Sequence, residues 1–208
     1  MTAPKTAPKT LLAMAGADTA PSALDESTLV LIDCQNEYVT GMLPLVGVDA
    51  AMDEVARLLA RARAAGTPIV HIAHAGRAGG AFDRDADGGQ IHAKAAPADG
   101  EPVVTKGLPN SFAGTTLQAE LERIGRKKLI LAGFQTHMCV SATARAALDL
   151  GYRSTVVASA AATRDLPGIA GGVVPAQVLH DAELAALADR FAMVAPTVDD
   201  VPDNATAG

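Results

Sequence analysis

The feature that most constrains the fold is the alternation of short apolar runs with longer segments of helical periodicity. The runs at 29–33, 68–73 and 128–132 read LVLID, PIVHIA and KLILA. Each is apolar almost without a break, which is typical of strands buried on both faces. A helix with one apolar face is predicted between Asp49 and Gly66. Strands that alternate with helices form parallel sheets covered on both sides. We therefore predict an α/β fold with three α-β-α layers, Rossmann-like topology and a mostly parallel sheet of about six strands.

The same patterns continue to the end of the chain and define its domain organisation. Further strands are predicted at 102–105, 154–159 and 191–194. Further helices are predicted at 116–125, from near His137, and at 175–190. The Gly- and Asp-rich segment 77–100 is long for a loop inside a compact domain, and loops of this length are either functional or disordered. We predict a partly flexible N-terminal arm over 1–27, a single domain over 28–196 and a flexible tail over 197–208.

Composition excludes several classes of function. The chain has 17 Lys and Arg against 23 Asp and Glu, a formal net charge of -6, which argues against binding to nucleic acid. No apolar run approaches the roughly 20 residues that cross a membrane. The 2 cysteines are too few for a disulfide framework. The apolar stretch after Lys5 and Lys9 is too brief for a good secretion signal, so a reduced, cytoplasmic setting is expected.

Three reactive side chains follow strands of the predicted sheet. Asp33 ends the first strand, Lys106 follows the third and Cys139 follows the fourth, and the carboxyl ends of parallel strands share one edge. Thr136 is a candidate N-cap, which places Cys139 in the first helical turn, where the helix dipole favours a thiolate. Asp33 is then suited to take the thiol proton and deliver it to a leaving amine. Taken singly, each residue also has a plain structural explanation: packing, turn capping or solvation.

Longer motifs carry a resemblance that these residues alone do not. The segments LVLIDCQNEY, VVTKGLPNSFAGTTLQAEL, LILAGFQTHMCVSATARAALDLGY and TVVASAAATRD occur in this order across 28–194. In this respect the chain resembles the isochorismatase-like cysteine hydrolases. The resemblance implies a catalytic triad of Asp33, Lys106 and Cys139 and a cis peptide between Phe134 and Gln135. It also implies an oxyanion hole formed by the backbone N–H groups of Gln135 and Cys139.

The cysteine indicates which branch of that family the chain resembles. Members with a cysteine nucleophile, such as nicotinamidases and carbamoyl-amine or ureido-acid hydrolases, cleave C–N bonds through a thioester. Members without it hydrolyse a vinyl ether, and that reaction and a catalytically silent oligomer remain alternatives. Nicotinamidases also bind a metal after the second strand. Here His71 and His74 lie three apart on a strand and face opposite sides, so no metal and no other cofactor is predicted.

The remaining predictions concern the substrate and the assembly. The substrate is expected to be a small molecule, selected in part by the 77–100 loop, with contacts from Gln35, Tyr38, His74, Phe112, Phe134 and His137. Core packing is an equal explanation for Phe112, and Arg164 either binds a substrate carboxylate or forms a surface ion pair. Cys34 is expected to point away from Asp33 into packing. The resemblance implies a homo-oligomer, either a dimer or a tetramer.

Overall fold

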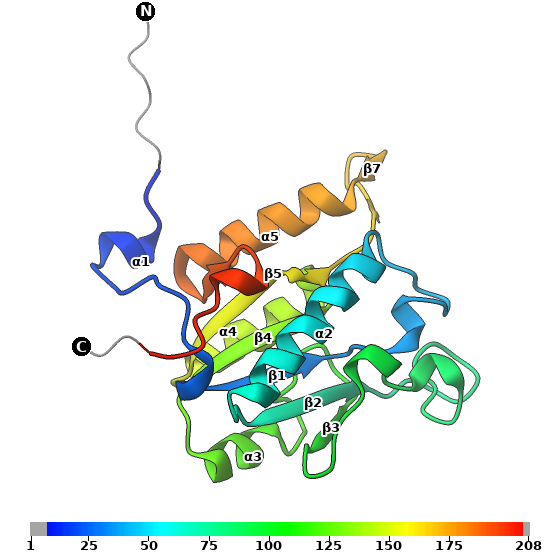
Figure 1. Cartoon of the computed structure of the whole chain (residues 1–208). Helices are drawn as coiled ribbons and strands as arrows, with labels where there is room; N and C mark the ends of the chain where they lie inside the picture. Colours follow the sequence, from blue (N-terminus) through cyan, green and yellow to red (C-terminus); the bar gives the residue numbers. More distant parts are fainter. Residues whose placement is uncertain (1–7, 206–208) are drawn as a thin grey trace, which may run out of the picture.

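The protein, described here by a computed structural model over residues 8–205, is built on one parallel sheet (Figure 1). Its six strands run in the order β3-β2-β1-β4-β5-β8, which confirms the predicted fold class. The strands are β1 Ser27–Ile32, β2 Ile69–His74, β3 Val103–Lys106, β4 Lys128–Phe134, β5 Arg153–Ala162 and β8 Met193–Ala195. The α-helices are α1 Leu11–Met14, α2 Val48–Ala64, α3 Leu117–Ile124, α4 Ser141–Asp149 and α5 Ala176–Arg190.

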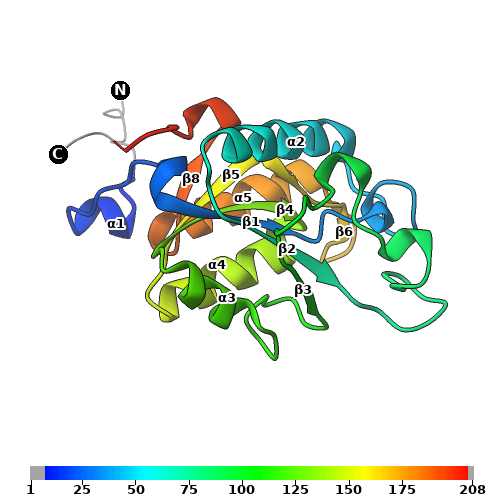
Figure 2. The same ribbon diagram turned by 60° about the horizontal axis from the view of Figure 1, so that its bottom comes forward.

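Helices cover both faces of the sheet and form the outer layers. Figure 2 shows α2 above the sheet and α3 and α4 below it. Alternate residues of β1 enter the two cores, because successive side chains of a strand point to opposite faces. Leu29 and Leu31 pack in the core under α2, whereas Val30 and Ile32 pack in the core with α3 and α4. This double burial explains why the strand sequences are continuously apolar.

The strand order places a topological switch point at the centre of the sheet. The chain runs outward from β1 through β2 to β3, then returns to β4 and runs the other way through β5 to β8. β1 and β4 are therefore neighbours whose onward connections leave in opposite directions. Open parallel sheets bind ligands beyond the carboxyl ends of such a strand pair. In this chain that edge carries the segments after Ile32 and Phe134.

Both terminal segments pack more closely on the domain than the sequence suggested. In the described part of the arm, Leu24 is fully buried and Arg153 bonds to Ser22 and to carbonyls of the arm. The tail was predicted to be flexible from residue 197, but Val198 and Val201 are fully buried under α2. Arg61 of α2 also donates to their carbonyl groups. Residues 1–7 and 206–208 lie outside the described part of the chain.

A short antiparallel hairpin, like the short helix α1 in the arm, is an element that the sequence patterns did not predict. It consists of β6 Leu166–Pro167 paired with β7 Val173–Val174 and precedes α5. Strands of two residues carry no readable periodicity, so only the glycines at the turn marked this region. Its tip residue Ile169 is fully exposed.

Candidate active site

The ends of β1 and β4 approach closely because of a glycine. Gly133 has a φ of 117°, and a Cβ atom there would lie 2.0 Å from the carbonyl oxygen of Ile32. Asp33 follows Ile32 directly and adopts the left-handed region with a φ of 51°, which Asp tolerates better than most residues. This backbone path turns Asp33 toward the segment after β4.

Lys106 contacts both of the other predicted catalytic side chains. It is the last residue of β3, and its Nζ lies 2.7 Å from Asp33 Oδ2 and 3.3 Å from Cys139 Sγ. The side chains of Asp33 and Lys106 have no exposed surface, and Cys139 is 3% exposed. Apart from the ion pair, the two carboxylate oxygens of Asp33 accept no well-formed hydrogen bond within residues 8–205. The carboxylate therefore retains capacity to accept a proton.

Cys139 lies in a turn of unusual geometry rather than in the first turn of an α-helix. A single π-helical turn, Thr136–Val140, follows β4 and leads into α4. The peptide bond between Phe134 and Gln135 is cis. The carbonyl oxygen of Gln135 accepts from the N–H groups of Met138 and Val140. Thr136 does not cap this turn as predicted, because its hydroxyl bonds to Nδ1 of His180 on α5 at 2.8 Å.

Burial controls the protonation of the site. Burial first and then the nearby Asp33 charge raise the pKa of Cys139, to about 12 after the opposing effect of Lys106. The resting cysteine is therefore a thiol, whereas the helix-end argument had favoured a thiolate. Burial also raises the pKa of Asp33, opposed by the Lys106 ammonium. A carboxylate with a raised pKa is a stronger base, which suits proton transfer from the thiol.

Aromatic side chains line the inner side of the site. The Tyr38 ring lies edge-on to Phe82 at 5.0 Å and to Phe134 at 5.9 Å, measured between ring centroids. Phe82 also contacts the His74 ring at 5.0 Å. Phe134 is fully buried and Tyr38 is 3% exposed, so both rings pack in the core under α2, and their contact with substrate stays a prediction. The sequence analysis missed Phe82, whose only signal was an isolated aromatic residue in a Gly-rich loop.

Two predicted substrate contacts have other roles in the structure. The Gln35 amide donates to the carbonyl oxygens of His74 and Gly89 and accepts from the His74 N–H, so its hydrogen-bonding groups are occupied. Phe112 stacks on Tyr152 at 6.0 Å. Tyr152 directly precedes β5, at the sheet edge opposite Cys139. This stacking supports the packing explanation for Phe112, and its contact with substrate stays a prediction.

His137, within the cysteine turn, lies close to Arg164, which follows β5. His137 Nδ1 bonds to the Thr163 hydroxyl at 2.5 Å, and burial, followed by the nearby Arg164 charge, lowers the pKa of His137. The Arg164 charge also lowers the pKa of Tyr38, which burial raises overall. The buried Nε of Arg164 has no hydrogen-bond partner among the described residues. A guanidinium with one buried, unused donor therefore lies near the site.

The remaining histidine and cysteine predictions follow the local packing. His71 is buried, and its Nε2 lies 2.8 Å from Glu101 Oε2 in a cluster that includes Arg63. Cys34 packs in the core under α2, away from Asp33 as predicted. Over residues 8–205, no three His, Cys, Asp or Glu side chains gather in a way that suits a metal ion.

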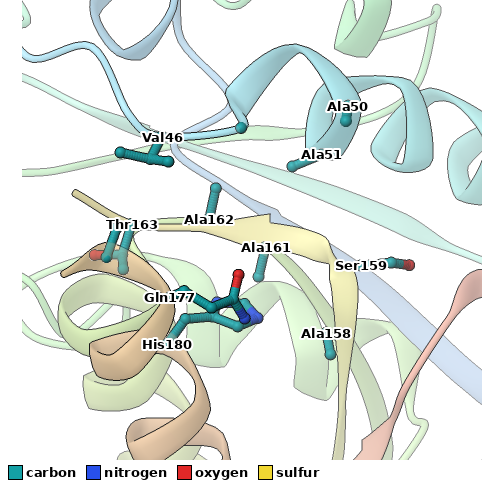
Figure 3. Close-up of a pocket in the computed structure, with 12 residues that line it drawn as sticks. Val46, Ala50, Ala51, Ala158, Ser159, Ala161, Ala162, Thr163, Gln177 and His180 are labelled. Carbon is teal, nitrogen blue, oxygen red and sulfur yellow. The ribbon is translucent and has the colours of Figure 1, made fainter. Parts of the chain in front are cut away.

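Two hollows flank this edge of the sheet. A hollow of about 460 Å³ is lined by His74 and by residues on either side of it in the fold: Ala75, Gly76, Arg77, Gly80, Ala81 and Gly107. A second, of about 210 Å³, lies between α2, β5 and α5 and is lined mainly by alanines (Figure 3). Gln177 and His180 of α5 border the second hollow, but none of the three triad residues lines it. The triad residues do not line the first hollow either, but His74, which does, has its Nδ1 3.2 Å from Lys106 Nζ.

Comparison with known proteins agrees with this geometry. The model of a family described as the isochorismatase domain matches residues 27–199, which span all six strands of the sheet. The chain belongs to the isochorismatase family. The family match stops short of the first residues of the arm and of the last residues of the tail.

Relatives within the isochorismatase family share most of the chain. The crystal structure of an isochorismatase from Pseudomonas putida KT2440 is 43% identical, covers 94% of this chain and 100% of its own, and superposes with a TM-score of 0.90. The secreted isochorismatase effector Isc1 of Verticillium dahliae is 38% identical over 89% of this chain and 96% of that protein. The maleamate amidohydrolase of Pseudomonas putida is 35% identical over 62% of this chain and 68% of that enzyme.

Two findings concern the cellular location of the protein. None of the helices within residues 8–205 has the length and apolar character needed to cross a membrane. One relative in the isochorismatase family is described as secreted. The cytoplasmic setting expected from the cysteine count therefore stays a prediction.

Proposed function

We propose that this isochorismatase-family hydrolase cleaves a C–N bond of a small amide, ureido or carbamoyl compound, with Cys139 as the nucleophile. One observation carries the proposal: Lys106 Nζ lies within 2.7 Å of Asp33 and 3.3 Å of Cys139 in a site with almost no exposed surface. A thiol, a carboxylate of raised basicity and an ammonium at these distances are the groups that acyl transfer through a thioester needs.

The first half-reaction forms the thioester. Asp33 takes the proton of the Cys139 thiol while Sγ forms a bond to the carbonyl carbon, and the carbonyl oxygen becomes an oxyanion. When the tetrahedral intermediate collapses, the C–N bond breaks and the leaving nitrogen takes the proton from Asp33. Ammonia or an amine departs. Lys106 keeps the Asp33 charge compensated throughout, because burial alone favours the neutral carboxyl group.

The second half-reaction releases the acid. Water attacks the thioester carbon and gives a proton to Asp33, and the C–S bond then breaks as the sulfur leaves. The proton returns from Asp33 to Cys139, which restores the resting thiol. In both steps the backbone N–H groups of Gln135 and Cys139 are proposed to donate to the oxyanion. No hydrogen bond from the Gln135 N–H to another described group competes with this role.

A negatively charged substrate fits the surroundings of the site. Arg164 has an unused buried donor and lies close enough to influence His137 and Tyr38. An arginine with free donors is well suited to bind a carboxylate. The maleamate amidohydrolase among the relatives has a name that states amide hydrolysis. We therefore place small amides that also carry a carboxylate first among the substrates.

Two alternatives remain within the same family. Vinyl-ether hydrolysis of the isochorismatase kind does not need a nucleophilic sulfur, so the contacts of Cys139 with Lys106 count against it. A catalytically silent oligomer has no need for a buried ion pair at the edge of its sheet, since such pairs are costly to bury. Both alternatives are separated from C–N hydrolysis by the products formed.

The deciding experiment measures ammonia release from matched panels of primary amides, ureido acids and carbamoyl compounds, each with and without a carboxylate. Wild-type protein should release ammonia, and Cys139→Ala should not. Acid quenching during turnover should leave an acyl group on the Cys139 peptide, detected by mass spectrometry. Cys34→Ala, which changes the other buried cysteine, is the matched control and should keep its activity. Turnover by Cys139→Ala at a rate near wild type would contradict the proposal.

We also propose that the chain self-associates. Exposed apolar side chains gather at the β6–β7 hairpin and the start of α5, namely Ile169, Val173 and Val178. Exposed apolar groups of this kind often mark protein–protein contacts. Sedimentation velocity should show a dimer or tetramer, and Ile169→Asp should reduce the assembly.

A further inference from the structure

We propose that His74 is a positioning residue whose neutral imidazole holds the Lys106 ammonium between Asp33 and Cys139. The kinetic test of this inference rests on the proposed function, whereas the test by cysteine alkylation does not. It assigns to His74 a role distinct from the substrate contact that the sequence suggested.

The ammonium of Lys106 has one acceptor for each of its three N–H groups. Nζ lies 2.7 Å from Asp33 Oδ2, 3.3 Å from Cys139 Sγ and 3.2 Å from His74 Nδ1. A Lys ammonium has three donors and no acceptor, and an unmet donor in a buried place is unfavourable. The Lys106 side chain has no exposed surface, so water does not take the place of a missing partner. His74 is therefore the third and completing partner.

The acceptor role fixes the state of the imidazole. Nδ1 accepts a hydrogen bond only when the ring is neutral and its proton is on Nε2. The surroundings favour that neutral form: burial and the adjacent Lys106 charge lower the pKa of His74 to about 4. The proton is then on Nε2, and His74 lines the hollow together with Gly76 and Arg77.

His74 is itself held in place on two sides. Its backbone N–H donates to Gln35 and its carbonyl accepts from the same amide, at 2.8 Å and 2.9 Å. Its ring lies edge-on to Phe82. His74 also pairs with Lys106 in register across β2 and β3, so neighbouring strands set the spacing of the two side chains. A lysine side chain is flexible, and a rigid acceptor at this position limits where its charge can lie.

The experiment compares three substitutions of His74. In His74→Asn the side-chain oxygen replaces Nδ1, in His74→Gln the acceptor lies one bond further out, and His74→Phe keeps the ring but has no acceptor. The first readout is the rate of Cys139 alkylation by iodoacetamide at pH 8.5, measured on Cys34→Ala protein. We expect a loss of about tenfold or more for His74→Phe and His74→Gln, and less than about threefold for His74→Asn, because a displaced ammonium stabilises the thiolate less.

The second readout is kinetic. On the best substrate of the amide panel, kcat should fall with the alkylation rate while KM changes less than about threefold. Gln118→Phe, which introduces the same aromatic side chain at an exposed position of α3 where the amide bonds to Glu122, should leave both readouts unchanged. Unchanged alkylation in His74→Gln and His74→Phe, with KM alone raised, would overturn the proposal and return His74 to a substrate contact. If no amide is hydrolysed, the proposed function fails, but the alkylation series still decides the role of His74.

Discussion

Lys106 Nζ and Asp33 Oδ2 lie 2.7 Å apart with both side chains fully enclosed by the protein. Moving two charges out of water is unfavourable, and their mutual attraction offsets this only when each keeps its partner. The pair is therefore better explained by chemistry than by stability. It also makes each residue sensitive to loss of the other.

Replacing Lys106 should reveal this dependence directly. Lys106→Met leaves the Asp33 carboxylate buried without a countercharge, and we expect the free energy of unfolding to fall by about 3–5 kcal/mol, together with loss of turnover. Urea unfolding at pH 7 measures the first effect. Lys94→Met is the matched control, because Lys94 pairs with Asp53 at the surface and such pairs contribute below about 1 kcal/mol. Equal losses in the two variants would contradict this account.

The variant Asp33→Asn tests whether the Asp33 carboxylate is the base that takes the proton of the Cys139 thiol. The amide keeps the size of the side chain but cannot take the thiol proton, and the pKa of Cys139, at about 12, leaves little thiolate at neutral pH. We expect kcat to fall by about a hundredfold or more. Asp53→Asn, at an exposed carboxylate, should change it less than about twofold. An Asp33→Asn enzyme within tenfold of wild type would mean that another group is the base.

The fold was predictable because its signals are local. Continuous apolar runs predicted strands of the sheet. The helix predicted to end at Gly125 does end there, and Gly125 adopts a left-handed φ of 80°. The alternation of strands and helices also predicted that Asp33, Lys106 and Cys139 follow strands at one edge of the sheet, and the three side chains do meet. Parallel-sheet topology alone places ligand sites at that edge, so the position of the site could be predicted without knowing the side-chain contacts.

The details around the triad were not predictable because they depend on contacts between distant segments. Gln35 was expected to touch substrate, but its amide is used by His74 and by Gly89 of the long loop. The thiolate expected at Cys139 depended on a helix end, and burial outweighs that effect. Neither burial nor partner choice can be read from spacing along the chain.

Gly133 should tolerate no side chain. Its φ of 117° is unfavourable for other residues, and a Cβ would lie 2.0 Å from the Ile32 carbonyl oxygen, which is backbone and cannot move aside. Gly133→Ala should therefore lower the unfolding free energy by more than about 2 kcal/mol and shift Asp33 enough to abolish turnover. Gly100→Ala has a φ of 86° with open space around it, so it isolates the backbone term, about 1 kcal/mol. Thermal unfolding of both variants makes the comparison.

Acid should weaken the fold through Glu101. Arg63 and His71 hydrogen-bond this carboxylate and hold its pKa at about 2, below its ordinary value of 4.5. The folded state therefore binds the proton less readily than the unfolded chain, and the stabilisation is complete above pH 4.5 and lost as the pH falls toward 2. Burial lowers the pKa of His71 as well, so acid also favours unfolding there.

Glu101→Gln should remove much of this pH dependence. At pH 7 the variant should be less stable by about 2–3 kcal/mol. The difference from wild type should shrink as the pH falls to 3, because the unfolded wild-type chain then binds a proton at Glu101 more readily than the folded state does. Urea unfolding at pH 7, 5 and 3 gives both curves. Glu120→Gln breaks a surface pair with Arg123, and its free energy of unfolding should differ from that of wild type by the same small amount at all three pH values. A gap that stays constant with pH would show that Glu101 acts through packing rather than through its charge.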